Sequence, residues 1–506
     1  MFTYKEGCTF KTLDDIAGKK ITVMGLGLNG GGEACVRFFL KRGAFVTVTD
    51  MKTSEQLKPT IERLNSDESL DKTRLNYILG EHRIQDFESA DCVIKNPGVK
   101  IEGNKFLAAA KNIETDISLF LHFSKAPIIA VTGSKGKSST ASAIHYGLCK
   151  AGYTSFLGGN ITVSPLTFLE KTSEETPVVL ELSSWQLADL RGRNALKPYI
   201  AIITKIVPDH QNWYGNMEDY VADKRLIYAD QTKGDYTIVD ADADEKDFKP
   251  KDASSWGKLF ASETKGTVLY YKRTAPSEWQ KFYGVWQQKT ESEQCGFVFL
   301  PGMKNPEKIM ESLSVPGEHM RTNALNAALV LYLMGVNPKK IINIMKSWQG
   351  LDHRLQYFYE YKGIKFYNDS CATVPEAAGA ASQAFEKPVY LLCGGTDKGL
   401  DFSAFINLLA GKAKKEFFEP KSIYLLEGSG TDKIVQGLKE NNISYSGPFP
   451  SLEDMLNSLK VELDKNGTKG DVVVFSPGAT SFGMFSNEFD RGNKYMQAVK
   501  KIMQQD

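Results

Sequence analysis

Short apolar runs alternate with amphipathic helical segments along most of this chain. Near the N-terminus, apolar runs at 20–24 and 44–50 flank a glycine-rich turn and a helical stretch. This order of strand, turn, helix and strand predicts one unit of a parallel sheet. A further buried strand within 90–99 ends at a Pro-Gly turn. We therefore expect a first, Rossmann-like α/β domain over residues 1–113.

A second α/β pattern starts at the apolar run 127–131 and continues through a helical stretch to three more apolar runs. It predicts a mostly parallel sheet. Residues 264–300 differ, because three short aromatic-rich runs follow one another there without a helix between them. We expect these runs to form a small antiparallel patch, added to a central domain that spans residues 114–349.

A third α/β pattern follows the pair Gln349-Gly350, which we expect to act as a hinge. Four apolar runs in this part each end in polar or glycine residues, as buried parallel strands do. Ligands of such sheets bind at the carboxyl ends of the strands. The pattern predicts a third, Rossmann-like α/β domain over residues 350–506.

The composition is that of an ordinary globular protein, with 506 residues, 42% hydrophobic and 24% charged. The 62 basic and 61 acidic residues give a net charge of +1, so no overall field attracts a polyanion, and we expect no nucleic-acid partner. The N-terminal stretch has charges where a signal peptide is apolar, and no apolar run reaches about 18 residues. We expect a monomeric, cytoplasmic protein without membrane insertion. The 7 cysteines form no CxxC pair, which argues against a zinc site.

The segment TGSKGKSS, residues 132–139, has the features of a phosphate-binding loop. It follows an apolar strand, its glycines let backbone N–H groups approach an anion, and the next helix presents its positive N-terminal end. The complete motif has glycine where Val131 stands, so this loop is a shortened form. The residues expected to bind the phosphates of ATP are Gly133, Ser134, Lys135, Gly136, Lys137, Ser138 and Ser139.

The turn GLGLNG, residues 25–30, fits a dinucleotide-binding fingerprint together with Asp50. The glycines accept a pyrophosphate and the acid binds a ribose, so any nucleotide diphosphate satisfies the pattern. An NAD-dependent oxidoreductase is therefore one interpretation, but it leaves the phosphate loop without a role. A ligase that activates a carboxylate with ATP uses both sites. Glu181 and His210 each follow an apolar run of the central domain, from which both could reach a metal ion near the phosphates.

The motifs, taken in order, resemble those of the Mur ligase family, and within it the MurD type. The resemblance covers nearly the whole chain. The matching segments are TGSKGKSS, GGNI (158–161), ELSSWQL (181–187), DH with ADKRLIY (222–228), GEHMRTNALNAA (317–328), GLDHR (350–354), NDSCAT (368–373), GGTDKGLDF (394–402) and SPGATSF (476–482).

This resemblance implies an ATP-dependent ligase of three domains, which bind a uridine nucleotide, ATP with Mg²⁺, and an incoming amino acid. The carboxylate of UDP-N-acetylmuramoyl-L-alanine would attack the γ-phosphate of ATP, and the amine of D-glutamate would then displace phosphate from the acyl phosphate. The turn at 25–30 would be a UDP site. Residues implied to contact the UDP substrate are Gly25, Gly27, Leu28, Asn29, Gly30, Asp50, Lys52, Asn96, Gly98 and Asn160.

The resemblance also implies roles at the reacting groups. Lys224 matches a lysine that the family carbamylates, which would turn a cation into an anion beside the metal. The implied catalytic residues are Lys137, Glu181, His210 and Lys224, and the implied magnesium ligands are Ser138, Glu181, His210 and carbamylated Lys224. Further implied ATP contacts are Asn323, Arg354 and Asp369, and the implied amino-acid contacts are Thr373, Lys398, Ser481 and Phe482.

Three residues depart from the pattern of the family. Met320 stands where the usual motif has asparagine, Cys371 where many members have lysine, and Glu488 where an aromatic residue is common. The missing lysine lies near the expected amino-acid site. Two alternatives to D-glutamate ligation therefore stay open: a sister ligase that adds another amino acid, such as L-glutamate, and an inactive nucleotide-binding protein.

Overall fold

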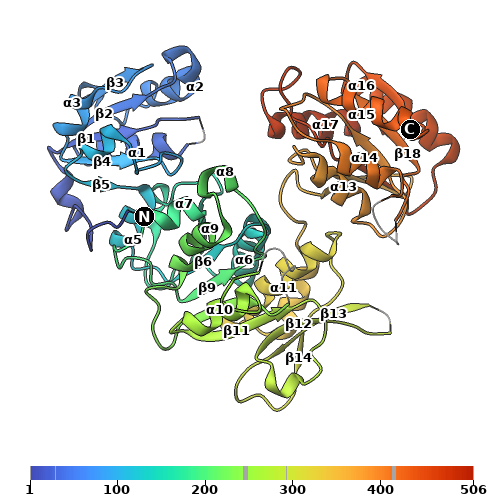
Figure 1. Cartoon of the computed structure of the whole chain (residues 1–506), viewed down its shortest axis with the longest axis horizontal. Helices are drawn as coiled ribbons and strands as arrows, with labels where there is room; N and C mark the ends of the chain where they lie inside the picture. The colour runs from blue at the N-terminus through green and yellow to red at the C-terminus, as the bar shows by residue number, and fades with distance from the viewer. Residues whose placement is uncertain (1, 29, 243–248, 292, 413–416, 505–506) are drawn as a thin grey trace. The chain divides into compact units, whose positions relative to one another are not determined.

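The computed structural model describes residues 2–28, 30–242, 249–291, 293–412 and 417–504. It shows a multidomain α/β protein built on three β-sheets, as the alternating pattern predicts (Figure 1). Among the described residues, no helix is both long enough and apolar enough to cross a lipid bilayer.

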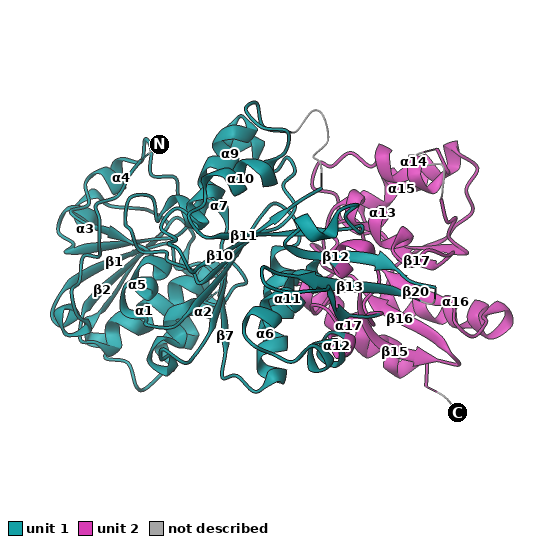
Figure 2. Ribbon diagram, turned by 90° about the horizontal axis from the view of Figure 1, so that it is seen from below, with its two compact units in different colours: residues 1–311, 322–345 teal, residues 312–321, 346–506 magenta. Residues whose placement is uncertain are grey.

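The chain folds as two compact units (Figure 2). Unit 1 comprises residues 1–311 and 322–345, and unit 2 comprises residues 312–321 and 346–506. Unit 1 contains the first two sheets and unit 2 the third. The domain boundaries expected near residues 113 and 349 stay predictions.

The first sheet is five-stranded and parallel, in the order β3-β2-β1-β4-β5. Its strands are β1 (Lys20–Met24), β2 (Phe45–Asp50), β3 (Leu75–Leu79), β4 (Cys92–Lys95) and β5 (Ile113–Glu114). The helices of this part are α1 (Gly31–Lys41), α2 (Ser54–Asn65), α3 (Ile84–Glu88), α4 (Lys105–Ala108) and α5 (Asp116–Phe123). Val23 on β1 lies between Val48 and Ile94 on the neighbouring strands, and all three are buried. Apolar contacts of this kind form the core of a sheet covered on both faces.

The second sheet has nine strands, in the order β14-β13-β12-β11-β10-β9-β6-β8-β7. They are β6 (Ile128–Thr132), β7 (Phe156–Gly159), β8 (Val178–Glu181), β9 (Ile200–Ile203), β10 (Tyr236–Asp240), β11 (Thr267–Lys272), β12 (Gly284–Lys289), β13 (Gln294–Phe299) and β14 (Glu307–Met310). The helices that follow them along the chain are α6 (Lys137–Ala151), α7 (Ser184–Ala188), α8 (Gln211–Tyr214), α9 (Met217–Lys224), α10 (Trp256–Glu263), α11 (Glu318–Leu333) and α12 (Pro338–Ser347).

The aromatic-rich stretch at 264–300 contains the predicted antiparallel patch, but the prediction is wrong for the first of its three runs. Strand β11 pairs parallel with β10, and β12 pairs parallel with β11. Among the described strand pairs of this nine-stranded sheet, only β12–β13 and β13–β14 are antiparallel. Helix α10 precedes β11 and supplies the crossover that a parallel strand needs. The first aromatic run therefore extends the parallel part of the sheet.

Unit 2 holds a six-stranded sheet in the order β15-β16-β20-β17-β18-β19. Its strands are β15 (Gln356–Tyr361), β16 (Ile364–Asn368), β17 (Tyr390–Cys393), β18 (Ser422–Leu426), β19 (Ser446–Phe449) and β20 (Val472–Phe475). Its helices are α13 (Pro375–Gln383), α14 (Ser403–Leu409), α15 (Ser429–Glu440), α16 (Leu452–Asn466) and α17 (Glu488–Ile502). Two separate apolar clusters contain alternate residues of the strands, such as Leu392 in one and Leu391 in the other. Both faces of this sheet are therefore covered.

Candidate nucleotide and substrate sites

The predicted phosphate loop lies between β6 and α6, and glycine is required at two of its positions. Gly133 and Gly136 have φ angles of 142° and 92°, which other residues rarely adopt. A Cβ atom on Gly133 would lie 2.0 Å from Thr204 Oγ1, and one on Gly136 would lie 2.6 Å from Asn323 Oδ1. The structure thus places Asn323, a predicted ATP contact, against the loop.

The other polar residues of the loop differ in their surroundings. Ser138 and Ser139 lie in the first turn of α6, and backbone N–H groups at a helix N-terminus favour an anion. Lys135 is exposed, and its Nζ lies 3.5 Å from Asp209 Oδ2. Thr140 donates from Oγ1 to Asn323 Oδ1 at 3.3 Å, which fixes the asparagine beside the first turn of the helix.

Lys137 and Ser134 both have partners within the protein. The Lys137 Nζ donates to the carbonyl oxygens of Gly133 and Ser134, each at 3.0 Å. Ser134 is 3% exposed, and its Oγ accepts from the Val207 N–H at 3.1 Å and from the Tyr220 hydroxyl at 3.0 Å. Ser134 therefore stabilises the shape of the loop, and the Lys137 amino group lies against the carbonyl oxygens of the loop.

Lys224 is almost fully buried at the same loop. It is 2% exposed, its Nζ donates to the Gly133 carbonyl oxygen at 2.8 Å, and it lies 4.4 Å from the centre of the Tyr220 ring. Burial holds the pKa of Lys224 well below its ordinary value, and the charge of Lys137 lowers it further. The neutral amine is the form that reacts with carbon dioxide. A carbamate nitrogen keeps one hydrogen, which is the number that a bond to the Gly133 carbonyl requires.

Glu181 ends strand β8 with one carboxylate oxygen unpaired. The side chain is 1% exposed, and its Oε1 accepts from Asn160 Nδ2 at 3.0 Å. The buried Oε2 has no hydrogen-bond partner. A buried carboxylate oxygen without a partner is costly, and a bound cation would remove that cost.

His210 has an uncommon backbone conformation, with φ of 52°, at the start of α8. Its ring lies 4.8 Å from that of Trp185. Burial lowers the pKa of His210 against the pull of the Asp209 carboxylate, and the charges of Lys137 and Lys135 lower it further. The imidazole is therefore neutral near pH 7, the form that binds metals.

The predicted magnesium site can be tested against these groups. In the described part of the chain, no three His, Cys, Asp or Glu side chains gather as a metal site. Mg²⁺ usually takes one or two carboxylates together with substrate phosphates and water. The free oxygen of Glu181 and a carbamate on Lys224 fit that donor set.

Asp50 fixes the shape of the glycine turn in the first sheet. The carboxylate is 9% exposed, and its Oδ2 accepts from the N–H groups of Leu26 at 2.9 Å and Gly27 at 3.1 Å. Its Oδ1 accepts from the Lys52 N–H at 2.9 Å. Asp50 thus has a clear structural function, and its contact with a ribose stays a prediction. Asn29, another predicted contact, lies outside the described residues.

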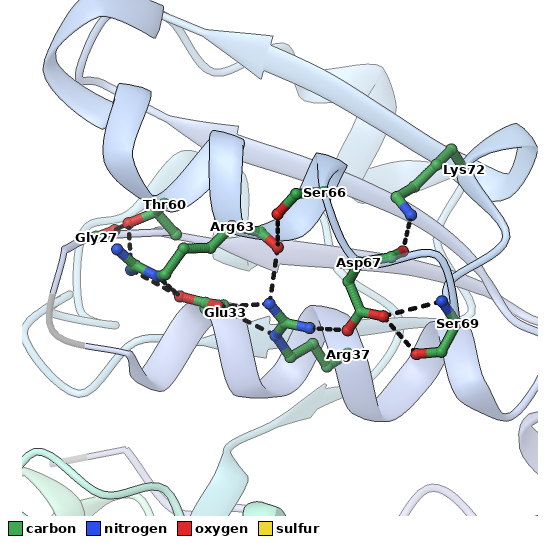
Figure 3. Close-up of polar contacts among 9 residues, drawn as sticks. All are labelled: Gly27, Glu33, Arg37, Thr60, Arg63, Ser66, Asp67, Ser69 and Lys72. Atoms are coloured by element: carbon green, nitrogen blue, oxygen red, sulfur yellow. Dashed lines mark hydrogen bonds and ion pairs between the residues drawn. The ribbon is translucent and has the colours of Figure 1, made fainter.

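A polar network connects α1 and α2 to the same turn (Figure 3). Thr60 donates from its hydroxyl to the Gly27 carbonyl oxygen at 3.1 Å and accepts from Arg63 Nη2 at the same distance. Glu33 accepts from both Arg63 and Arg37. Gly27 is therefore held through its N–H by Asp50 and through its carbonyl by Thr60.

A cavity of 350 Å³ lies in unit 1 between the ends of the first two sheets. Of the predicted UDP-substrate contacts, Gly25, Asn96, Gly98 and Asn160 line it. Leu28 and Lys52 do not belong to its lining; Leu28 is 48% exposed. Residues from α7 form another part of the wall, and Asn160 connects the cavity to Glu181.

The predicted amino-acid contacts come from three adjoining loops at the carboxyl ends of β16, β17 and β20. Thr396 and Thr480 exchange two backbone hydrogen bonds, of 3.1 and 3.0 Å, and the Gly478 N–H donates to the Ala372 carbonyl at 2.9 Å. These bonds bring together the loops that contain the predicted residues Thr373, Lys398, Ser481 and Phe482. Lys398 and Phe482 are exposed, and Ser481 is buried.

Asp369 lies at the end of β16 beside Arg354. Its Oδ1 accepts from the Leu355 N–H at 3.1 Å, and its Oδ2 accepts from Ser476 Oγ at 2.6 Å. Burial raises the pKa of Asp369 to about 7, against the hydrogen bonds and the charge of Arg354. The structure therefore brings the two predicted ATP contacts of unit 2 close to one another.

None of the three residues that depart from the family pattern carries a positive charge. Met320 is 3% exposed, so it is a buried apolar residue. Burial raises the pKa of the Cys371 thiol to about 11, which keeps it neutral at pH 7. Glu488 begins helix α17.

Arg491 supports the same loops and was missed by our sequence analysis. It is 1% exposed; its guanidinium donates to the Ser370 hydroxyl and carbonyl at 3.0 and 2.8 Å, and to the Ala479 carbonyl at 3.0 Å. It therefore joins the loop after β16 to the loop after β20. The sequence signal was the segment NEFDRG near the C-terminus, where an arginine precedes a glycine in the first turns of a helix.

Comparison with known proteins gives the same picture for the whole chain. The model of the Mur ligase middle domain matches residues 131–331, and that of the MurD-like N-terminal domain of Mur ligases matches residues 19–117. A UDP-N-acetylmuramoylalanine–D-glutamate ligase of Treponema pallidum (strain Nichols) is 38% identical, over 97% of this chain and 99% of the relative. The ligase of the same name from Borreliella afzelii (strain PKo) is 36% identical, over the same shares of the two chains.

Solved structures share the fold at lower identity. The UDP-N-acetylmuramate-alanine ligase MurC of Thermotoga maritima is 17% identical, with a TM-score of 0.56, over 96% of this chain and 99% of its own. The MurF ligase of Thermotoga maritima, solved in complex with ADP, is 16% identical, with a TM-score of 0.53, over 99% of this chain and 98% of its own. The phosphate loop, the arrangement of the sheets and these full-length relatives agree. The chain belongs to the Mur ligase family and to its MurD-like branch.

Proposed function

We propose that this chain is an ATP-dependent ligase that forms an amide bond between UDP-N-acetylmuramoyl-L-alanine and D-glutamate, a step in making a peptidoglycan precursor. The observation that carries the proposal is the buried Lys224, bonded to Gly133 of the phosphate loop. A hydride-transferring enzyme has no use for such a lysine, whereas a phosphoryl-transferring ligase does. The names of the full-length relatives support the choice of substrates.

The first step joins the substrate carboxylate to ATP. A carboxylate oxygen attacks the γ-phosphorus, the bond to the β-phosphate oxygen breaks, and ADP leaves. The backbone from Gly133 to Ser138 and the ammonium of Lys137 stabilise the charge that spreads over the transferred group. Asn323 adds an amide beside the loop, and Arg354 and Asp369 are further proposed ATP contacts.

Mg²⁺, when bound, neutralises charge on the phosphates. We place its protein ligands at Ser138, Glu181 and His210, with a carbamate on Lys224 as the fourth. The unpartnered Oε2 of Glu181 and the lowered pKa of His210 support this assignment. Lys224 is suited to form the carbamate because its pKa is well below that of an exposed lysine.

The second step uses the incoming amino acid. Its amine attacks the acyl carbon, the tetrahedral intermediate expels phosphate, and the nitrogen loses a proton to give the amide. We assign the binding of D-glutamate to Thr373, Lys398, Ser481 and Phe482, since their loops adjoin. Lys398 is exposed and can pair with a carboxylate of glutamate.

All of these roles fall on one chain, so the proposal requires no second copy, and we expect a monomer in sedimentation experiments. The reaction consumes ATP and a UDP-linked substrate, and we place it in the cytoplasm.

Phosphate release tests the proposal. The purified chain is mixed with ATP, Mg²⁺ and UDP-N-acetylmuramoyl-L-alanine, and with D-glutamate, L-glutamate, L-lysine or no amino acid. We expect release with D-glutamate alone, its loss in Lys137→Ala, and unchanged release in Lys233→Ala, which changes an exposed lysine of the central domain. Release with a different amino acid alone would replace the acceptor. No release under any condition would favour an inactive nucleotide-binding protein.

A further inference from the structure

A buried ion pair lies beside the cavity of 350 Å³. Lys95, the last residue of β4, is 3% exposed, and Asp189, which follows α7, is 5% exposed. The Lys95 Nζ lies 2.8 Å from Asp189 Oδ2. Tyr4 donates from its hydroxyl to the other oxygen of Asp189 at 2.9 Å. None of these residues belongs to the set given a role in the reaction above.

The ammonium of Lys95 also holds the turn that follows it. Nζ donates to the carbonyl oxygens of Asn96 at 3.1 Å and Val99 at 2.9 Å. The ammonium thus has two hydrogen bonds to this turn and an ion pair with Asp189. Asn96 and Gly98 of this turn line the cavity, so Lys95 fixes the conformation of one wall.

Asp189 adjoins another part of the wall, because its N–H donates to the carbonyl oxygen of Trp185 at 3.1 Å. Helix α7 is only five residues long and starts at its cap, Ser183, two residues after Glu181. Ser183, Trp185 and Gln186 line the same cavity. The ion pair therefore connects the turn after β4 in the first sheet to the helix after β8 in the second sheet.

Stability alone gives little reason for such a pair. Removing two charges from water is costly, and apolar side chains of similar volume often give equal or greater stability at buried sites. The pair instead fixes geometry, because an ammonium bonded to two carbonyl oxygens of the turn and paired with Asp189 permits few other arrangements of that turn.

We propose that Lys95 and Asp189 are positioning residues that set the shape of the UDP-substrate cavity by holding its two walls in register. This inference rests on the proposed function for the identity of the ligand. It predicts that the pair affects binding of the uridine substrate and leaves ATP binding unchanged, since neither residue touches the phosphate loop.

The chain offers a matched control. Arg193 and Glu114 form a second buried pair, with Nη1 and Oε2 2.9 Å apart and side chains 3% and 2% exposed. Glu114 lies on β5 of the first sheet, and Arg193 follows α7, so this pair joins the same two parts of unit 1. Neither residue lines the cavity of 350 Å³. Glu114→Gln therefore removes one buried charge, as Asp189→Asn does, without altering the walls.

The experiment compares Lys95→Met, Asp189→Asn and Glu114→Gln. Calorimetric titration with UDP-N-acetylmuramoyl-L-alanine, without ATP, gives the Kd, and phosphate release gives KM for each substrate. We expect Lys95→Met to raise the Kd and KM of the uridine substrate about tenfold, Asp189→Asn to raise them severalfold, and KM for ATP to change less than about twofold. Glu114→Gln should lower the melting temperature as much as Asp189→Asn does, but it should leave the Kd of the uridine substrate unchanged. The double variant Lys95→Met/Asp189→Leu restores apolar packing, and it is expected to recover stability but to bind weakly.

Two results would overturn the inference: a double variant that binds as the parent chain does, or a Glu114→Gln variant that loses as much affinity as Lys95→Met. A parent chain that binds no uridine substrate contradicts the proposed function instead. Hydrogen exchange then tests the role of the ion pair, because Lys95→Met must accelerate exchange of the amides of Asn96, Gly98 and Val99, and Glu114→Gln must not.

Discussion

Lys224 combines near-complete burial with a position at the phosphate loop, and this makes its chemistry testable. We expect Lys224→Arg to lower kcat by about 100-fold, because arginine keeps the positive charge but cannot form a carbamate. Phosphate release measures the effect. The parent chain should lose activity in buffer free of carbon dioxide and regain it with bicarbonate, and ¹³C NMR in labelled bicarbonate should show one carbamate signal that Lys224→Arg lacks.

The outcome has a clear alternative. If Lys224 acts only as a cation, Lys224→Arg keeps most of the activity, and removal of bicarbonate has no effect. Lys233→Arg serves as the control, since it makes the same change at an exposed position of the central domain.

Asp369 gives unit 2 a pH-dependent stability. Its pKa is raised to about 7 in the folded chain, from an ordinary value of 3.8, so the folded state binds the proton more tightly than the unfolded state does. The stabilising contribution is complete below pH 3.8 and is lost as the pH rises through 7. Asp369→Asn imitates the neutral acid and removes this dependence.

Urea unfolding at pH 5 and pH 8 tests this expectation. Relative to the parent chain, Asp369→Asn should be more stable at pH 8 than at pH 5, by a difference on the order of 2 kcal/mol. Equal differences at the two pH values would mean that Asp369 titrates outside this window. The comparison with the parent removes the contributions of other acids.

At the scale of single elements, the glycine turn before α1 depends on a side chain of α2. Thr60 is fully buried and donates to the Gly27 carbonyl (Figure 3). Thr60→Val has the same shape but leaves that carbonyl and Arg63 Nη2 without this partner. We expect the variant to lose about 1–2 kcal/mol of stability and to raise KM for the uridine substrate severalfold, measured by urea unfolding and phosphate release. Thr60→Ser keeps the hydroxyl and should restore both; if it behaves like the valine variant, methyl packing is responsible.

Elements with strong local signals were predictable from sequence. The apolar run before TGSKGKSS became β6, and the glycines of that segment occupy positions where no other residue fits. Strands at the sheet edges were harder, because β15 and β19 are partly exposed and lack the continuous apolar runs of central strands. Long-range partners left no signal at all. Lys95 and Asp189 are 94 residues apart in sequence, and only the packing of two sheets brings them together.

At the scale of the whole molecule, the predicted binding residues for the uridine substrate all fall in unit 1 and those for D-glutamate in unit 2. Each ligand should therefore stabilise one unit. Tryptophan fluorescence distinguishes them, since Trp348 is the only tryptophan of residues 346–506 and the other tryptophans belong to unit 1.

Urea unfolding of the Trp348→Phe chain then reports unit 1 alone. UDP-N-acetylmuramoyl-L-alanine at about 100 times its Kd should stabilise the fluorescence transition by about 2.7 kcal/mol, because it binds only the folded unit. D-Glutamate should leave that fluorescence transition in place. Circular dichroism senses both units, and D-glutamate should shift the part of its signal that comes from the unfolding of unit 2. If D-glutamate, added without the uridine substrate, shifts the fluorescence transition, its contacts lie in unit 1. The assignment of its binding to Thr373, Lys398, Ser481 and Phe482 would then be wrong.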